Sequence, residues 1–108
     1  MKQIAIISGG YSSEIIISRK SAVTIYKNID TSRFIPHIVE INKDGWFYIN
    51  KEGNQIEIDK NDFSAIVNGE KILFDVCFIT IHGTPGEDGK LQGYFDSIGM
   101  KYINSGVY

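Results

Sequence analysis

The sequence of 108 residues contains a single cysteine, so no disulfide can form within the chain. We therefore expect a protein of a reducing, cytoplasmic compartment. Neither sign of charge dominates, because 11 Lys and Arg are balanced by 13 Asp and Glu, which gives a formal net charge of -2. This balance provides no basic surface for nucleic acid or anionic membranes, so we expect neither as a partner.

Several other features are missing. No apolar run approaches the roughly 20 residues that a membrane-spanning helix needs. Met1-Lys2 leads directly into a short strand-like segment, so we expect no signal peptide. The two histidines have no cysteine cluster beside them, and neither GxGxxG nor a GxxxxGKS or GxxxxGKT pattern occurs. We therefore expect no metal site and no nucleotide-binding loop within the chain.

The residues that are present have the composition of an ordinary globular domain, with 43% hydrophobic and 22% charged. A chain of this length has room for one hydrophobic core. We therefore expect residues 1–108 to form a single domain.

The amino-terminal segment has the pattern of a buried strand, a glycine loop and a helix. Residues 3–8 are strand-like, and the glycine loop follows them. A helix is predicted from Glu14 to about Ile29, and Ser12 or Ser13 can cap it.

This predicted helix is amphipathic. Its apolar positions recur every three to four residues, at Ala22, Ile25, Tyr26 and Ile29. The basic residues Arg19, Lys20 and Lys27 are expected to lie in water on the other faces. The helix should therefore pack one face against a sheet.

A second strand, loop and helix occur near the other end of the chain. Residues 74–81 are typical of a central parallel strand that is buried on both faces. Glycine and proline then exclude regular structure in residues 82–89, and a short helix follows that ends before Gly99. Open α/β sheets bind ligands at the carboxyl ends of their strands. We therefore expect a ligand site where this loop leaves the sheet.

The middle of the chain is predicted to be rich in strands. Residues 34–41 are strand-like, and two hairpins are predicted after them. The hairpins join residues 45–49 to 55–58 and residues 63–67 to 70–74. Asn68-Gly69 lies within the second hairpin and is favoured in turns where both central residues need positive φ. The predicted fold class is α/β, a Rossmann-like three-layer parallel sheet with a hairpin-rich insertion.

Two motifs in these segments resemble the amino-terminal domain of the D-alanine-D-alanine ligases. They are ISGGYSSEIIISRKSA near the start and HGTPGEDGKLQG near the end, and the closing YINSGV is similar as well. The resemblance implies the fold of a pre-ATP-grasp domain. It also implies that this domain binds substrate in an enzyme that forms the D-alanyl-D-alanine dipeptide for peptidoglycan of the cell wall.

Glu14 and His82 are the predicted catalytic and substrate-binding residues. A carboxylate at a helix start often only complements the helix dipole, and a histidine after a strand often only binds nearby backbone. The resemblance implies more specific roles. Glu14 would bind the ammonium group of the first D-alanine, and His82 would orient this substrate and stabilise charge as its carboxylate becomes an acyl phosphate.

Two further residues are predicted to support this pair. Ser13 is a candidate cap beside Glu14. Glu87 can hydrogen-bond His82 or a lysine of another domain, although bracing of its own loop fits the sequence equally well. His37, within a strand, is interpreted as structural.

The resemblance also implies ATP and Mg²⁺ as cofactors of the intact enzyme. They would be bound by ATP-grasp domains that these 108 residues do not include. We therefore expect no cofactor in this chain and no ligase activity from the chain alone. A homodimer is expected for the intact enzyme, because the ligases are commonly dimers.

Two alternatives stay open at the level of sequence. The chain can belong to a D-alanine-D-lactate ligase or another ATP-grasp enzyme, whose second substrate is selected by residues elsewhere. It can also be a free-standing α/β binding module without catalysis. A ligand or partner of its own would distinguish the second alternative.

Overall fold

The computed structural model describes residues 1–10, 15–81 and 90–104. The strands in chain order are β1 (Lys2–Gly9), β2 (Phe34–Asn42), β3 (Gly45–Ile49), β4 (Gln55–Glu57), β5 (Ala65–Val67), β6 (Glu70–Ile72), β7 (Val76–Ile79) and β8 (Tyr102–Asn104). The helices are α1 (Ile15–Asn28) and α2 (Lys90–Ile98). Both predicted helices and all predicted strands are therefore present, although the strands of the second hairpin and the strand predicted over residues 74–81 are shorter than expected.

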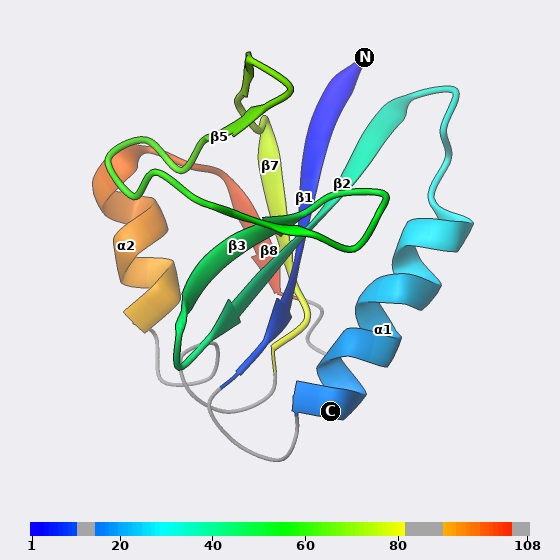
Figure 1. Ribbon diagram of the computed structural model, residues 1–108, viewed down its shortest axis with the longest axis horizontal. Helices are drawn as coiled ribbons and strands as arrows, with labels where there is room; N and C mark the ends of the chain where they lie inside the picture. The colour runs from blue at the N-terminus through cyan, green and yellow to red at the C-terminus, as the bar shows by residue number, and fades with distance from the viewer. Residues whose placement is uncertain (11–14, 82–89, 105–108) are drawn as a thin grey trace.

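Six strands form the main sheet in the order β4-β3-β2-β1-β7-β8. β1 pairs in parallel with β2 and β7, and β7 pairs in parallel with β8. α1 covers one face of this sheet and α2 covers the other (Figure 1). The predicted three-layer α/β arrangement is therefore confirmed.

The first hairpin was predicted to be part of an insertion, and the structure differs. β3 and β4 continue the main sheet, because β3 pairs antiparallel with β2 across a short turn. In this turn the side chain of Asn42 accepts a hydrogen bond from the Asp44 amide at 2.8 Å. The sheet is therefore mixed rather than wholly parallel, and only β5 and β6 stand apart as a separate two-stranded sheet.

The turn between β5 and β6 has the predicted geometry. Asn68 and Gly69 have φ angles of 53° and 79°, so both central residues are left-handed. This matches the twist of the flanking strands and explains why an Asn-Gly pair occurs here.

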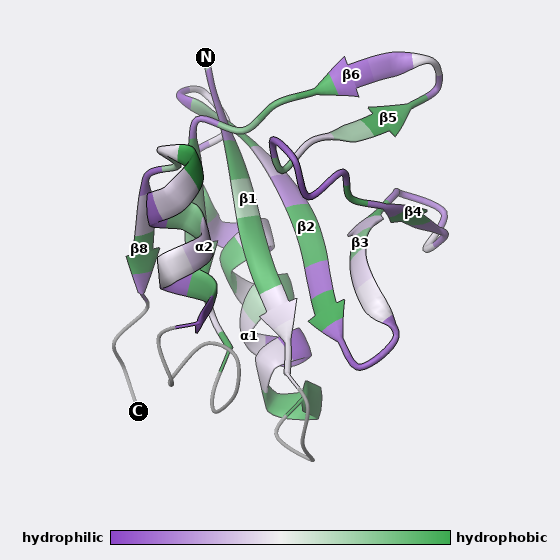
Figure 2. Cartoon of the chain, turned by 90° about the vertical axis from the view of Figure 1, so that its left-hand side faces the viewer, coloured by the Kyte–Doolittle hydropathy of each residue, from purple (hydrophilic) through white to green (hydrophobic). Residues whose placement is uncertain are grey.

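The apolar face of α1 packs on β1 as the sequence predicts. Ala22 is buried against Ile4 and Ile6 of β1, and Ile25 and Tyr26 lie beside them. Figure 2 shows hydrophobic residues along β1, on which this face of α1 packs. Contact between this face and β1 fixes the helix directly over the strand that precedes it.

α2 is held on the other face by an aromatic cluster. The ring of Phe63 is fully buried, and its centroid lies 5.0 to 6.1 Å from those of Trp46, Phe74, Tyr94 and Phe95. Phe63 has a φ of 56°, which costs a residue with a side chain about 1–2 kcal/mol. Burial of its ring contributes about 1.5–3 kcal/mol and offsets that strain.

The carboxyl end of α2 is closed by the predicted glycine cap. Gly99 has a φ of 74°, and the amide of Met100 donates to the carbonyl of Phe95 at 2.9 Å. This left-handed cap satisfies carbonyls that the helix end would otherwise leave free. It turns the chain directly into β8.

Candidate functional site

The two strand exits that the sequence selects lie side by side. β1 and β7 are adjacent and parallel, with Ile7 opposite Ile79, so both end at the same edge of the sheet. The described chain leaves this edge at Gly10 and at Ile81. α1 begins at the same end of the molecule (Figure 1). The fold therefore brings together the chain segments that lead toward both predicted motifs.

The four predicted site residues lie outside the described residues. These are Ser13, Glu14, His82 and Glu87. Their predicted roles stay predictions, and the geometry available is that of their neighbours in the chain. The site is therefore built from the residues around the two strand exits.

A buried hydrogen-bond network joins these exits to α1. The amide of Gly9 donates to the Ser18 hydroxyl oxygen at 3.0 Å. The Ser18 hydroxyl lies 3.1 Å from the carbonyl oxygen of Thr80, to which it donates. The Thr80 hydroxyl in turn donates to the carbonyl of Ile7 at 2.7 Å. One network therefore connects the end of β1, the first turns of α1 and the residue after β7.

Sequence reasoning did not identify Ser18 or Thr80. A signal was present for Ser18, because it lies four residues before Ala22 and hence on the apolar face of the helix. A polar side chain on such a face needs a hydrogen-bond partner when it is buried. Thr80 sits within an apolar run, where threonine is a common strand residue and attracts no notice.

An ion pair lies next to this network on the α1 face of the sheet. Arg19 donates from Nε to Glu40 Oε1 at 2.6 Å and from Nη2 to Oε2 at 2.9 Å. Asn42 also donates to Oε2, at 2.8 Å. Arg19 is exposed, as the sequence predicts, but its guanidinium group also pairs with Glu40, a residue that is only 6% exposed.

The ion pair sets the charge state of this region. Hydrogen bonds from Arg19 hold the pKa of Glu40 below its usual range, although burial opposes the shift. The same contact raises the pKa of Arg19. Both groups line a hollow of about 370 Å³ together with Ser8 at the end of β1. The hollow thus contains a fixed, mutually neutralised pair of charges.

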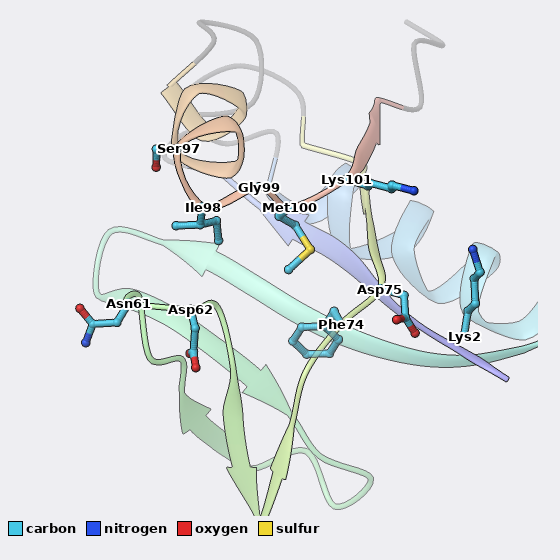
Figure 3. A pocket seen from close by; sticks show the side chains of 10 residues that line it. All are labelled: Lys2, Asn61, Asp62, Phe74, Asp75, Ser97, Ile98, Gly99, Met100 and Lys101. Carbon is cyan, nitrogen blue, oxygen red and sulfur yellow. The ribbon is translucent and has the colours of Figure 1, made fainter.

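A different hollow, of about 640 Å³, lies at the opposite end of the sheet, where β1 and β7 begin. Figure 3 shows it between the end of α2 and the β5-β6 hairpin, with Phe74, Asp75 and Met100 among its residues. Its carboxylates already have structural partners. Asp75 accepts from the Gln3 amide at 2.6 Å, and Asp62 pairs with Lys71 at 2.7 Å. It is therefore not the candidate site.

His37 has no free ring nitrogen. Its Nδ1 lies 2.7 Å from the Tyr48 hydroxyl, and its Nε2 lies 2.5 Å from Gln3 Oε1. Burial lowers the pKa of His37, which favours the neutral ring. This geometry agrees with a structural role.

Within the described ranges, no group of three or more His, Cys, Asp or Glu side chains is arranged to hold a metal ion. Across those same residues, neither helix has the length and hydrophobicity needed to cross a bilayer.

Comparison with known proteins identifies relatives over nearly the whole chain. The family described as D-ala D-ala ligase N-terminus matches residues 3–105. A D-alanine--D-alanine ligase from Parabacteroides distasonis is 54% identical over 98% of this chain and 32% of its own length. The chain therefore spans about a third of the length of the curated relatives that it matches.

Solved structures show the same relationship. D-alanyl-alanine synthetase A from Vibrio cholerae has a TM-score of 0.78 and 31% identity over 94% of this chain and 30% of its own. The VanG D-Ala:D-Ser ligase from Enterococcus faecalis has the same TM-score of 0.78, with 27% identity over 94% of this chain and 35% of its own. Ligases named for two different products therefore share this fold.

Proposed function

The chain belongs to the D-alanine-D-alanine ligase family, as its amino-terminal domain, and we propose that it provides the D-alanine-binding part of an ATP-dependent ligase. The observation that carries the proposal is the family match over residues 3–105, which includes both motifs at adjacent strand exits. The product would be the D-alanyl-D-alanine dipeptide for peptidoglycan synthesis.

Glu14 and His82 are the proposed residues for the first D-alanine. Glu14 immediately precedes α1, and a helix amino terminus repels an ammonium group because both are positive. A carboxylate at this position would reverse that repulsion and bind the substrate amine. His82 would donate a hydrogen bond to the substrate carboxyl group as negative charge develops on it.

The proposed reaction has two steps. The carboxylate of one D-alanine takes up the terminal phosphoryl group of ATP and becomes an acyl phosphate. The amine of a second D-alanine then attacks the acyl carbon, and phosphate leaves to give the dipeptide. Mg²⁺ supplies charge neutralisation during phosphoryl transfer when it is bound.

ATP and Mg²⁺ are proposed to bind to ATP-grasp domains outside residues 1–108. We propose a cytoplasmic homodimer for the intact enzyme, and we expect the 108-residue chain alone to be inactive.

A ligase with another second substrate is the alternative that a specific observation favours. The D-Ala:D-Ser ligase from Enterococcus faecalis matches this fold as well as the Vibrio cholerae protein does. The shared fold would bind the first D-alanine in both cases. Residues outside this chain would then select the second substrate.

The test is a ligase assay on the product of the intact gene, which in this proposal carries the chain as its amino-terminal third. The wild-type protein should form the dipeptide from D-alanine only when ATP and Mg²⁺ are present. Glu14→Gln should raise the KM for the first D-alanine about 10- to 100-fold, since hydrogen bonds to charged groups contribute about 1.5–3 kcal/mol.

Glu57→Gln is the matched control, because Glu57 lies exposed in β4. Its kinetics should equal those of the wild type. Absence of dipeptide from the wild-type protein would overturn the proposed ligase. Unchanged D-alanine kinetics in Glu14→Gln would instead remove only this residue from the site. Incubation of the wild-type protein with D-alanine and either D-serine or D-lactate shows, in the same assay, whether the ligase uses another second substrate.

A further inference from the structure

α1 has two buried side chains, and one of them is polar. Ala22 packs among apolar residues of the sheet, whereas Ser18 is fully buried and hydrogen-bonded. Burial of a hydroxyl group is unfavourable unless its hydrogen bonds are satisfied. The surroundings of Ser18 therefore define a specific set of contacts.

The two hydroxyl groups also contact each other. The Thr80 hydroxyl donates to the Ile7 carbonyl at 2.7 Å and lies 3.2 Å from Ser18 Oγ, where either hydroxyl can be the donor. The Gly9 amide donates to Ser18 Oγ, so the Ser18 proton is free to donate to the Thr80 carbonyl at 3.1 Å. The Thr80 amide also donates to Ile7, at 2.9 Å. Each hydroxyl therefore links two segments that are distant in the sequence.

The residues that form these links are close in the sequence to the proposed substrate-binding residues. Ser18 is four residues after Glu14, and Thr80 is two residues before His82. We propose that Ser18 and Thr80 are positioning residues, which fix the start of α1 relative to the exit of β7. The inference rests on the proposed ligase function and deepens it.

The separation between α1 and β7 matters because Glu14 and His82 are proposed to hold one small substrate from two chain segments. Displacement of a reacting group by about 1 Å can cost about 100-fold in rate. Loss of the Ser18 hydroxyl removes the acceptor of the Gly9 amide, and loss of the Thr80 hydroxyl removes its 3.2 Å contact with Ser18. Either loss weakens the link between α1 and the sheet and favours a shift of the helix. Such a shift should raise the KM for D-alanine more than the KM for ATP.

Ser64 distinguishes positioning from simple stabilisation. It is also a buried serine, and its hydroxyl donates to Asp62 Oδ1 at 2.5 Å. It lies beside β5, at the opposite end of the molecule from the two strand exits (Figure 1). Removal of its hydroxyl should lower the free energy of unfolding without changing the KM for D-alanine.

The experiment uses the product of the intact gene. Thr80→Val keeps the side-chain shape without the hydroxyl, and Ser18→Ala removes the other hydroxyl. Both should raise the KM for the first D-alanine about 10- to 100-fold, with the KM for ATP changed less than about twofold. Thr80→Ser, which keeps the hydroxyl, should restore D-alanine kinetics, and Ser64→Ala should leave them unchanged.

Three results would overturn the inference. Thr80→Val could bind D-alanine as the wild type does, Thr80→Ser could be as impaired as Thr80→Val, or Ser64→Ala could raise the same KM. If Ser18→Ala does not fold, Ser18→Cys fills the site with a slightly larger side chain and weakens the hydrogen bonds, so its KM should still exceed that of the wild type. A wild-type protein without ligase activity would overturn the proposed function and this inference with it.

Discussion

Gly9→Ala is expected to be the most damaging small substitution at the strand exits. Gly9 has a φ of 119°, which an alanine adopts only with strain. A Cβ atom added there would lie 2.0 Å from the carbonyl oxygen of Ile41 and 2.8 Å from its carbonyl carbon. Both are backbone atoms of β2, so β1 and β2 must separate locally to admit the methyl group.

The loss of stability in Gly9→Ala has two parts. The left-handed backbone contributes about 1–2 kcal/mol for a residue with a side chain. Separation of β1 from β2 would break the hydrogen bond from Gly10 to the Ile41 carbonyl at 2.7 Å, and the accompanying displacement of Gly9 would break its hydrogen bond to Ser18 of α1 at 3.0 Å. Each such bond contributes about 1 kcal/mol. The free energy of unfolding should therefore fall by about 3–4 kcal/mol.

Urea unfolding of the 108-residue chain, followed by circular dichroism, measures this change. Two glycines serve as controls because neither has an atom within 4 Å of an added Cβ. Gly69→Ala retains only the backbone strain, at a φ of 79°, and should lose about 1–2 kcal/mol. Gly93→Ala lies within α2 and should gain about 0.5–1 kcal/mol. A loss in Gly9→Ala no larger than that in Gly69→Ala would refute the reasoning.

Three other substitutions or reactions test separate parts of the account. Arg19 lowers the pKa of Glu40, so the pair stabilises the fold above the ordinary glutamate pKa of 4.5, and this stability is lost as the pH falls through the lower folded-state pKa. Glu40→Gln should therefore cost about 1–3 kcal/mol near neutral pH and less near about pH 3; equal losses in urea unfolding would contradict this. Burial raises the pKa of Cys77 to about 12, so iodoacetamide at about pH 8 should modify it only after unfolding, and rapid modification of the native chain would count against the buried strand. In the intact gene product, His82→Ala should lower kcat for dipeptide formation about 100-fold, and a kcat equal to that of the wild type would exclude its proposed role.

Local patterns account for the parts of the fold that the sequence predicts. The spacing of Ala22, Ile25 and Tyr26 determines the buried face of α1, because a helix repeats every 3.6 residues. Asn68-Gly69 and Gly99 mark a turn and a helix end, since each occupies a left-handed conformation. These signals depend on residues that are close together in the chain.

The features that the sequence did not predict depend on distant residues. Ser18 and Thr80 are separated by 62 positions, and Arg19 and Glu40 by 21. No local pattern reports such pairs, because they depend on how α1 is placed over β1, β2 and β7. The pairing of β3 with β2 has the same origin, since a hairpin pattern does not say which strand it joins. The motifs around Glu14 and His82 were recognised by family resemblance, and their geometry stays a prediction.

Domain replacement tests the central claim most directly. Residues 1–108 would replace the amino-terminal third of the Parabacteroides distasonis ligase, to which they are 54% identical. The resulting protein should form D-alanyl-D-alanine with ATP, and Glu14→Gln within it should raise the KM for the first D-alanine. A folded chimaera that binds ATP but forms no dipeptide would contradict the claim that this chain provides a D-alanine-binding domain.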